Sequence, residues 1–200
     1  MMKLNTLLLR QRIHAAHGFA CEAFLYSAHA STPAQIVARL ADFIDGLGVD
    51  RLHLVGHSLG GLLVMRLLTQ SKNLPPGRAV LLGAPVVRSR AAEGLAASTL
   101  GRLMLGTAGL EELVFEQGRV WTGAREIGCI AGNLRIGLGQ VIGRIAAEND
   151  GSVAVEETRL LGARDHIVLP VSHTGLLFSQ EVAQQTGAFL ADGAFVRPAP

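Results

Sequence analysis

The sequence predicts an α/β fold in which a mostly parallel sheet is covered by helices on both faces, a three-layer α/β/α architecture. Short apolar runs such as AVLLGAP (79–85) alternate with longer segments whose apolar residues recur every three or four positions. Strands that are apolar on both faces belong in a sheet with helices on both sides. The 200 residues, 49% hydrophobic and 17% charged, suffice for one domain spanning 1–200.

The chain is expected to begin with a helix over residues 3–16, which Gly18 ends, and a short strand within FACEAFLYS, residues 19–27. The helix spacing places four residues on one apolar face: Leu4, Leu7, Leu8 and Ile13.

The clearest helix lies within residues 31–48. Ser31 or Thr32 can cap it, Pro33 suits its first turn, and Gly48 is the expected stop. Six apolar residues form its stripe: Ile36, Val37, Leu40, Phe43, Ile44 and Leu47. A buried strand and an apolar helix are then expected at residues 51–55 and 59–71.

The second half of the chain continues the alternation. Further strands are expected at 79–85, 125–132 and 165–171, and helical segments at 153–160 and 179–190. Residues 86–118 carry helix-like pieces broken by glycines, where a lid, an acyl-chain pocket or extra scaffold helices would lie.

Charge and hydropathy exclude several classes of partner. With 18 basic and 16 acidic residues the net charge is +2, so we expect neither a nucleic-acid nor an anionic-membrane partner. No apolar run approaches the roughly 20 residues of a membrane span. Because Arg10 and Arg12 interrupt the apolar patch at the start, it fails as a signal peptide. A cytoplasmic protein that takes small neutral or apolar ligands is expected, unless a leader precedes Met1.

The two cysteines, Cys21 and Cys129, are expected to be buried free thiols. They lie far apart in apolar surroundings, without a CxxC or Cys/His spacing, so no metal is expected.

The strongest chemical signal is the GxSxG motif from Gly56 to Gly60, which centres on Ser58 and lies between an expected strand and an expected helix. In this context the serine hydroxyl projects from a strained turn, and side chains two residues to either side, at Gly56 and Gly60, would collide with the neighbouring strand or helix. The Leu59 N–H, at the helix start, then faces the place where an oxyanion would form. The competing interpretation is a glycine-lined crossing with an incidental serine.

A nucleophilic serine needs a histidine to take its proton and a carboxylate to orient that histidine. In this architecture both follow the serine, on loops after later strands. His173 follows the expected strand 165–171, whereas His166 lies at its start, so His173 is the preferred base. A merely structural His173 would make a local hydrogen bond at a helix entry. His53, within a strand, and His57, inside the motif, are interpreted as scaffold.

Asp150 is the preferred acid because it lies in the loop after strand 125–132, 23 residues before His173. Asn-Asp-Gly is also a turn signal by itself, which leaves a purely structural role open. Asp165 shares the strand-start position of His166, and Glu148 and Glu156 are weaker candidates.

Four segments together resemble a known family: HLVGHSLGGL, LLGAP, NDGSVAVEET and LPVSHTGLLFS. They are similar to the small bacterial serine esterases and lipases of the α/β-hydrolase superfamily, over nearly the whole chain from Phe19 to Leu190. The resemblance implies Ser58 as nucleophile, Asp150 as acid and His173 as base. It also implies hydrolysis of carboxylic esters through an acyl-enzyme, without a cofactor.

The resemblance has one departure. Such hydrolases normally begin with a strand that ends in a His-Gly motif and supplies the second oxyanion N–H. His17 and Gly18 do not fit that role, because only a strand, a helix and a strand are expected between them and Ser58. In the family, the His-Gly motif is followed by a helix, a strand, a helix and a strand. The expected fold is therefore truncated at its N-terminus. The strands could close up, a partner chain could supply one, or the gene could start upstream, which we favour as a hypothesis.

The leading hypothesis is thus a serine hydrolase acting on a small or medium acyl ester. The two competing hypotheses are a non-catalytic relative that binds a partner and an acyltransferase that uses the same triad. The sequence leaves the oligomeric state open.

Overall fold

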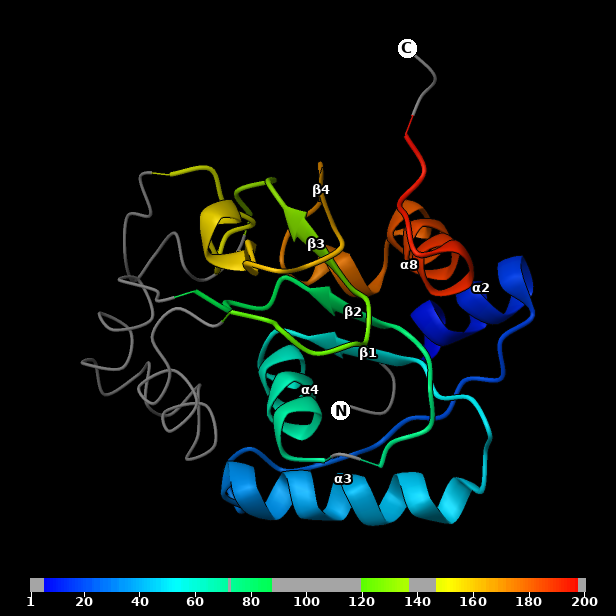
Figure 1. Cartoon of the computed structure of the whole chain (residues 1–200). Coiled ribbons are helices and arrows are strands. Elements are labelled where there is room, and N and C mark those ends of the chain that lie inside the picture. The colour runs from blue at the N-terminus through cyan, green and yellow to red at the C-terminus, as the bar shows by residue number, and fades with distance from the viewer. Residues whose placement is uncertain (1–5, 72, 88–119, 137–146, 198–200) are drawn as a thin grey trace.

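The computed structural model describes residues 6–71, 73–87, 120–136 and 147–197. Its centre is a parallel sheet with the strand order β1-β2-β3-β4, which confirms the predicted fold class (Figure 1). The strands are β1 (Leu54–His57), β2 (Ala79–Leu82), β3 (Ile127–Gly132) and β4 (Asp165–Leu169). The helices are α2 (Leu7–His17), α3 (Pro33–Leu47), α4 (Leu59–Gln70) and α8 (Gln180–Asp192), with 3-10 turns η1 (Val155–Thr158) and η2 (Gly175–Leu177).

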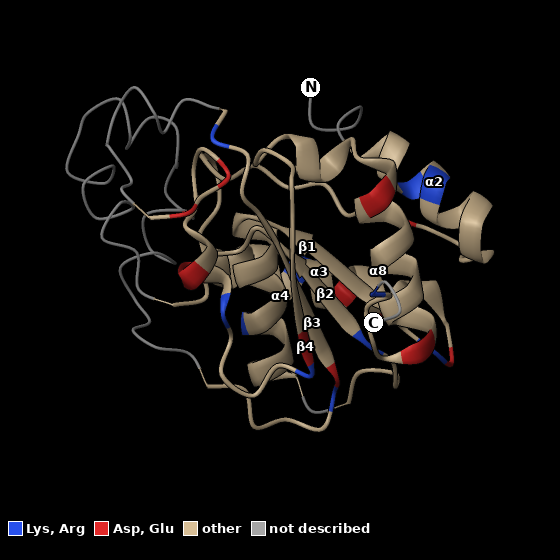
Figure 2. Ribbon diagram, turned by 90° about the horizontal axis from the view of Figure 1, so that it is seen from above, with Lys and Arg blue, Asp and Glu red and all other residues tan. Residues whose placement is uncertain are grey.

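Two helical layers cover the sheet because strand side chains alternate between its faces. In β2, Ala79 and Leu81 belong to the core that includes α3 and α4, whereas Val80 and Leu82 belong to the core that includes α2 and α8. All four side chains are buried. Seen from above, α4 lies on one side of the strands and α8 on the other (Figure 2). The three-layer arrangement is therefore built by period-two burial in the central strands.

Helix α3 follows its sequence signals closely. The Thr32 hydroxyl accepts a hydrogen bond from the Gln35 N–H, the Gln35 side chain accepts one from the Thr32 N–H, and Gly48 ends the helix with a φ of 59°. This reciprocal capping satisfies two N–H groups that a helix start leaves unpaired. The predicted stripe is confirmed at its centre, where four residues are buried: Ile36, Val37, Leu40 and Ile44.

Helix α2 ends at Gly18 as predicted, but its predicted apolar face is only partly right: Ile13 is buried as predicted, and Leu7 is not. The buried residues are Leu9 and Ile13, whereas Leu7 is 43% exposed. The helix is held against α8 along this four-residue spacing. Leu4 lies outside the described residues.

The strand expected at residues 19–27 is also wrong: among the described residues this segment pairs with no strand. It runs from α2 to α3 past the outer side of β1 (Figure 1). Its first ring, Phe19, meets His53 just before β1, and at its other end the Tyr26 hydroxyl lies beside Gly60 in α4. A strand is held by hydrogen bonds to a neighbouring strand, and no such ladder joins this segment to β1.

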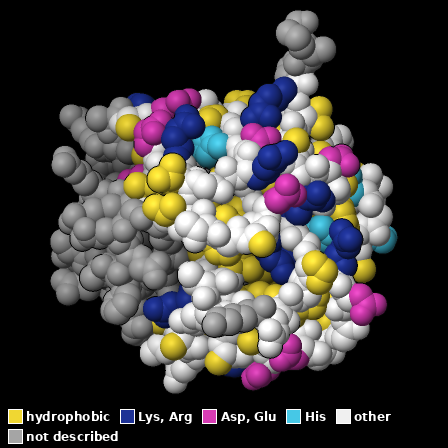
Figure 3. Space-filling model, in the orientation of Figure 1, with side chains coloured by type: hydrophobic (Ala, Val, Ile, Leu, Met, Phe, Trp, Pro, Cys, Tyr) yellow, Lys and Arg dark blue, Asp and Glu magenta, His cyan; other side chains and the backbone are white. Residues whose placement is uncertain are grey.

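Among the described residues β1 is therefore an edge strand. The buried strand expected at 51–55 starts only at Leu54, and Val55 is 38% exposed, because α2 and α8 cover β2 to β4 on that face. Figure 3 shows hydrophobic side chains in a hollow near the centre of the face seen in Figure 1.

The remaining expected elements are present; the strands are shorter than expected, whereas α8 ends at Asp192, two residues beyond its expected end. The segment 153–160 contains the 3-10 turn η1, and strands β2, β3 and β4 lie inside the expected ranges. The interpretation of 86–118 as a lid or insertion falls almost wholly outside the described residues, and the single-domain boundary stays a prediction.

Both cysteines are free thiols, as expected. Cys129 is buried, and burial raises the pKa of its thiol to about 12. Cys21 is only half-buried, contrary to expectation, because it lies in the unpaired segment after α2. Within the described part of the chain, no helix has the length and apolar character that crossing a membrane requires.

Candidate active site

Three predicted residues lie after the carboxyl ends of strands. Ser58 follows β1, Asp150 lies in the loop after β3, and His173 follows β4. Because the strands are parallel, these loops gather at one edge of the sheet.

Ser58 occupies a strained backbone turn. Its φ of 52° and ψ of −123° make it the one non-glycine residue with positive φ among those the structure describes. The Ser58 N–H donates to the Leu82 carbonyl at 2.9 Å, and the Ser58 carbonyl accepts from the Gly61 N–H at 2.9 Å. A side chain in such a conformation costs about 1–3 kcal/mol, which the two bonds and the packing of α4 offset. The Leu59 N–H, at the first position of α4, points out of the helix start.

The glycines around the serine do not share the steric role equally. A Cβ on Gly56 would lie 2.6 Å from the Gly60 carbonyl oxygen, so the first motif glycine is required as expected. A Cβ on Gly60 would meet nothing nearer than the Tyr26 hydroxyl at 3.6 Å, an ordinary contact. The expectation that Gly60 is sterically required is therefore wrong. The tight position is Gly61, whose Cβ would lie 2.5 Å from the Ala84 Cβ.

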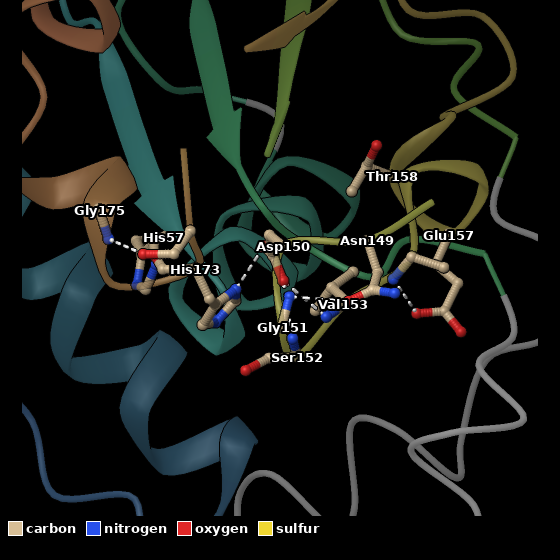
Figure 4. A network of polar contacts seen from close by, with 12 residues as sticks. His57, Asn149, Asp150, Gly151, Ser152, Val153, Glu157, Thr158, His173 and Gly175 are labelled. Carbon is tan, nitrogen blue, oxygen red and sulfur yellow. Dashed lines mark hydrogen bonds and ion pairs between the residues drawn. The ribbon is translucent and has the colours of Figure 1, made fainter. Parts of the chain in front are cut away.

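Asp150 is a buried carboxylate whose oxygens both have donors. Its side chain is 1% exposed. One oxygen, Oδ1, accepts from the Ser152 and Val153 N–H groups at 2.9 and 2.8 Å. The other, Oδ2, lies 2.7 Å from Nδ1 of His173 (Figure 4). The turn role and the pairing role of Asp150 therefore occur together, because the turn's N–H groups fix the carboxylate that faces the histidine.

His173 is held by its backbone as well as by its ring. Its N–H donates to the Asp150 carbonyl at 2.8 Å, in addition to the ring contact with the carboxylate. A carboxylate accepts only, so Nδ1 carries the proton and Nε2 is the ring nitrogen left to accept one. Gly83, with a φ of 54°, permits this approach: a Cβ there would lie 3.2 Å from both Asp150 Oδ2 and His173 Nδ1, and 2.6 Å from Leu176 Cδ1.

His57 supports His173 from the β1 side. Its Nε2 donates to the His173 carbonyl at 2.9 Å, and the two rings lie 4.7 Å apart between centroids (Figure 4). Burial, followed by the proximity of His173, lowers the pKa of His57 to about 4. The ring is therefore neutral near pH 7 and adds no positive charge beside His173. The interpretation of His57 as scaffold fits this geometry, but the residue it supports is one of the predicted site residues.

The structure joins Asp150 to His173 directly. Among the described residues, no hydrogen bond joins the Ser58 hydroxyl to His173; the link between them runs through the neighbouring His57. Hydrogen bonds between nucleophile and base are often long in unliganded enzymes, so this geometry remains compatible with a triad.

The rival residues have their own partners. Asp165, at the start of β4, accepts from Arg197 at 2.6 Å, which holds the pKa of its carboxyl below the usual range. His166 Nε2 lies 2.9 Å from the Thr158 hydroxyl. The weaker acids and the strand histidine pair away from the site as well: Glu148 with Asn133, Glu156 with Arg159, and His53 with the Arg78 N–H.

Two contributors were missed by sequence reasoning. The first is Gly83, the glycine within LLGAP, which directly follows β2. A glycine at the end of a predicted strand was the sequence signal that could have identified it. No sequence signal links His57 to His173, because the contact spans 116 residues.

Within the described ranges, no group of three His, Cys, Asp or Glu side chains lies close enough together to bind a metal ion. A surface cavity of about 320 Å³ lies elsewhere, lined by residues that include Leu68, Trp121 and Arg125. It borders the opposite end of the strands, so we do not connect it with the site.

Comparison with known proteins identifies the family of the chain. Residues 7–191 match the family model described as "Alpha/beta hydrolase family". No curated protein sequence is significantly similar.

Solved structures show the same fold at low identity. A hydrolase from Agrobacterium vitis is 16% identical with a TM-score of 0.60, over 96% of this chain and 81% of its own. The mature lipase BlEst2 of Bacillus licheniformis is 19% identical with a TM-score of 0.54, over 72% of this chain and 67% of its own. This chain spans only 36% of the propeptide form of that lipase. A meta-cleavage product hydrolase from Pseudomonas fluorescens is 15% identical with a TM-score of 0.55, over 94% of this chain and 86% of its own.

The packing at the turn predicts that alanine at Gly61 and alanine at the adjacent Gly60 have different effects on stability. Gly61→Ala should lower the free energy of unfolding by about 1–3 kcal/mol relative to Gly60→Ala, because its Cβ would overlap Ala84. Both changes carry the same gain in helix propensity, so their difference isolates the contact. Urea unfolding of the two variants measures it, and equal stabilities would contradict this packing.

The partly buried His57 predicts a loss of stability in acid. Its pKa is about 4 when folded and near 6.5 when unfolded, so the stability it contributes is complete above pH 6.5 and is lost as the pH falls toward 4. The loss is up to about 3 kcal/mol, since one pKa unit corresponds to ~1.4 kcal/mol. His57→Gln keeps a donor at the Nε2 position without a titrating ring. Its unfolding free energy should fall less than that of the wild type between pH 7 and pH 4.5.

The lowered pKa values of His53 and His166 act in the same pH window and are present in both proteins, so the difference isolates His57. Parallel pH profiles for the two proteins would show that His57 does not titrate as described.

Proposed function

Because the chain belongs to the alpha/beta hydrolase family, we propose that it is a serine hydrolase that cleaves carboxylic esters of small or medium acyl groups. The observation that carries this proposal is the buried Asp150 carboxylate, held 2.7 Å from Nδ1 of His173. This pair lies at the sheet edge where Ser58 follows β1. A buried carboxylate that orients a histidine beside a serine in a strained turn is the arrangement that acyl transfer needs.

In the proposed reaction, Nε2 of His173 takes the Ser58 proton while Oγ attacks the ester carbonyl carbon. The resulting oxyanion accepts a hydrogen bond from the Leu59 N–H. The tetrahedral species collapses, the C–O bond to the alcohol breaks, and the imidazolium returns its proton to the departing alcohol. Water, deprotonated by the same nitrogen, then attacks the acyl-enzyme, releasing the acid and restoring Ser58.

Electrostatics support these roles. The Asp150 carboxylate accepts two backbone N–H bonds and the His173 Nδ1–H, so it lies where it can stabilise the imidazolium as it forms. Neutral His57 beside His173 does not oppose that positive charge. The chain's own residues thus supply nucleophile, base, orienting acid and one oxyanion donor.

The test is labelling with a fluorophosphonate probe together with hydrolysis of a short-chain nitrophenyl ester. Ser58→Ala should abolish both signals, whereas Ser27→Ala, a change at an exposed serine outside the site, should leave both unchanged. Asp150→Asn should lower kcat by about three to four orders of magnitude, because the histidine loses its orienting anion. Asp192→Asn, at the exposed end of α8, is the matched control.

Labelling that persists in Ser58→Ala would refute the assignment of the nucleophile. A folded wild type with neither signal would favour a non-catalytic relative. Turnover in the presence of a competing alcohol or amine, with analysis of the products, separates hydrolysis from acyl transfer.

A further inference from the structure

The proposed reaction assigns one oxyanion donor, the Leu59 N–H, whereas such sites work best with more than one. An unused hydroxyl lies close by. We propose that the Tyr26 hydroxyl is a second oxyanion donor of this enzyme. This inference rests on the proposed function and names a catalytic residue for it.

The course of residues 19–27 brings Tyr26 to the right edge of the sheet. Phe19 meets His53 before the start of β1, with ring centroids 5.2 Å apart, and Tyr26 reaches Gly60 beyond its end. The segment thus runs in the same direction as β1, and Tyr26 lies at the carboxyl edge where Ser58 is found.

At that edge the Tyr26 hydroxyl lies beside the first turn of α4. It is 3.6 Å from the position of a Cβ on Gly60. With a C–C bond of ~1.5 Å, this places the hydroxyl oxygen within about 5 Å of the Gly60 Cα. Gly60 is two residues after Ser58 and one after Leu59, so the hydroxyl stands next to the helix start whose free N–H groups face a developing negative charge.

The hydroxyl has a proton to donate. Within the described part of the chain it makes no hydrogen bond, and it is not among the unpaired polar atoms sealed from solvent. Tyr26 is half-buried, and a packed tyrosine ring normally gives its hydroxyl a partner, so a hydroxyl left open beside a serine turn is available to a ligand.

The ring is fixed while the hydroxyl is open. Tyr26 packs against Phe24, with ring centroids 6.2 Å apart, and against the core formed with α3 and α4. A donor on a fixed ring needs little reorganisation when charge develops, which is the condition for effective electrostatic stabilisation.

The protonation state suits a donor. Burial raises the pKa of Tyr26 to about 12, so the phenol keeps its proton at neutral pH. No proton is transferred from Tyr26 in the reaction: its O–H donates a hydrogen bond to the carbonyl oxygen as that oxygen gains charge, while His173 carries the only mobile proton.

The test is Tyr26→Phe, which removes one oxygen atom and keeps the ring. We expect kcat and the rate constant for fluorophosphonate labelling of Ser58 to fall by about 10²-fold, with KM nearly unchanged, because the lost bond forms only in the transition state. Phe24→Leu is the matched control: it loosens packing in the same segment but leaves the hydroxyl, so it should keep the wild-type rates. Thermal unfolding of all three proteins accompanies the kinetics.

Each outcome decides the inference. Ser58 labelling at the wild-type rate in Tyr26→Phe would overturn it and leave the proposed function intact. Equal rate losses in both variants, in step with lost thermal stability, would overturn it in favour of packing. A folded wild type in which Ser58 is neither labelled nor active would overturn the proposed function and this inference together.

Discussion

Ser58 reverses the chain between β1 and α4 with a positive φ, and the site depends on how closely strand and helix can approach at that turn. A Cβ on Gly56 or Gly61 would separate them, and α4 would then be displaced from Ala84. Because the Ser58 N–H is tied to the Leu82 carbonyl, the turn is also registered against β2. The position of the serine is therefore set by backbone hydrogen bonds and by the absence of side chains on neighbouring glycines, rather than by contacts of the serine side chain.

Asp150 and His173 are also positioned by backbone hydrogen bonds and by a glycine that leaves room for them. Gly83 at the end of β2 lacks the side chain that would separate Asp150 from His173, and the turn after Asp150 donates two N–H groups to its carboxylate. His57, the residue before the nucleophile, donates to the His173 carbonyl. The turn that exposes Ser58 thus also anchors the loop that carries His173, so movement of either would disturb both.

The open side of β1 gives this fold its particular character. Residues 19–27, predicted as a strand, pass beside β1 without pairing, and Val55 remains exposed. The same irregular course carries Tyr26 to α4 beside Ser58. An exposed strand edge is usually an aggregation risk, and β1 limits it by being only four residues long.

The sequence by itself determined the elements whose signals are local. The Thr32 cap, the Gly48 stop, the alternation of β2 and the strained turn at Ser58 all follow from residues within a few positions of one another, and the parallel order then assigned Asp150 and His173 to one edge. Contacts between distant segments were decided only by the tertiary structure. Whether α2 buries Leu9 or Leu7, whether residues 19–27 have a strand to pair with, and which glycine is tight all depend on neighbours that periodicity does not reveal. The support of His173 by His57 belongs to the same class, because it joins loops at the ends of two different strands.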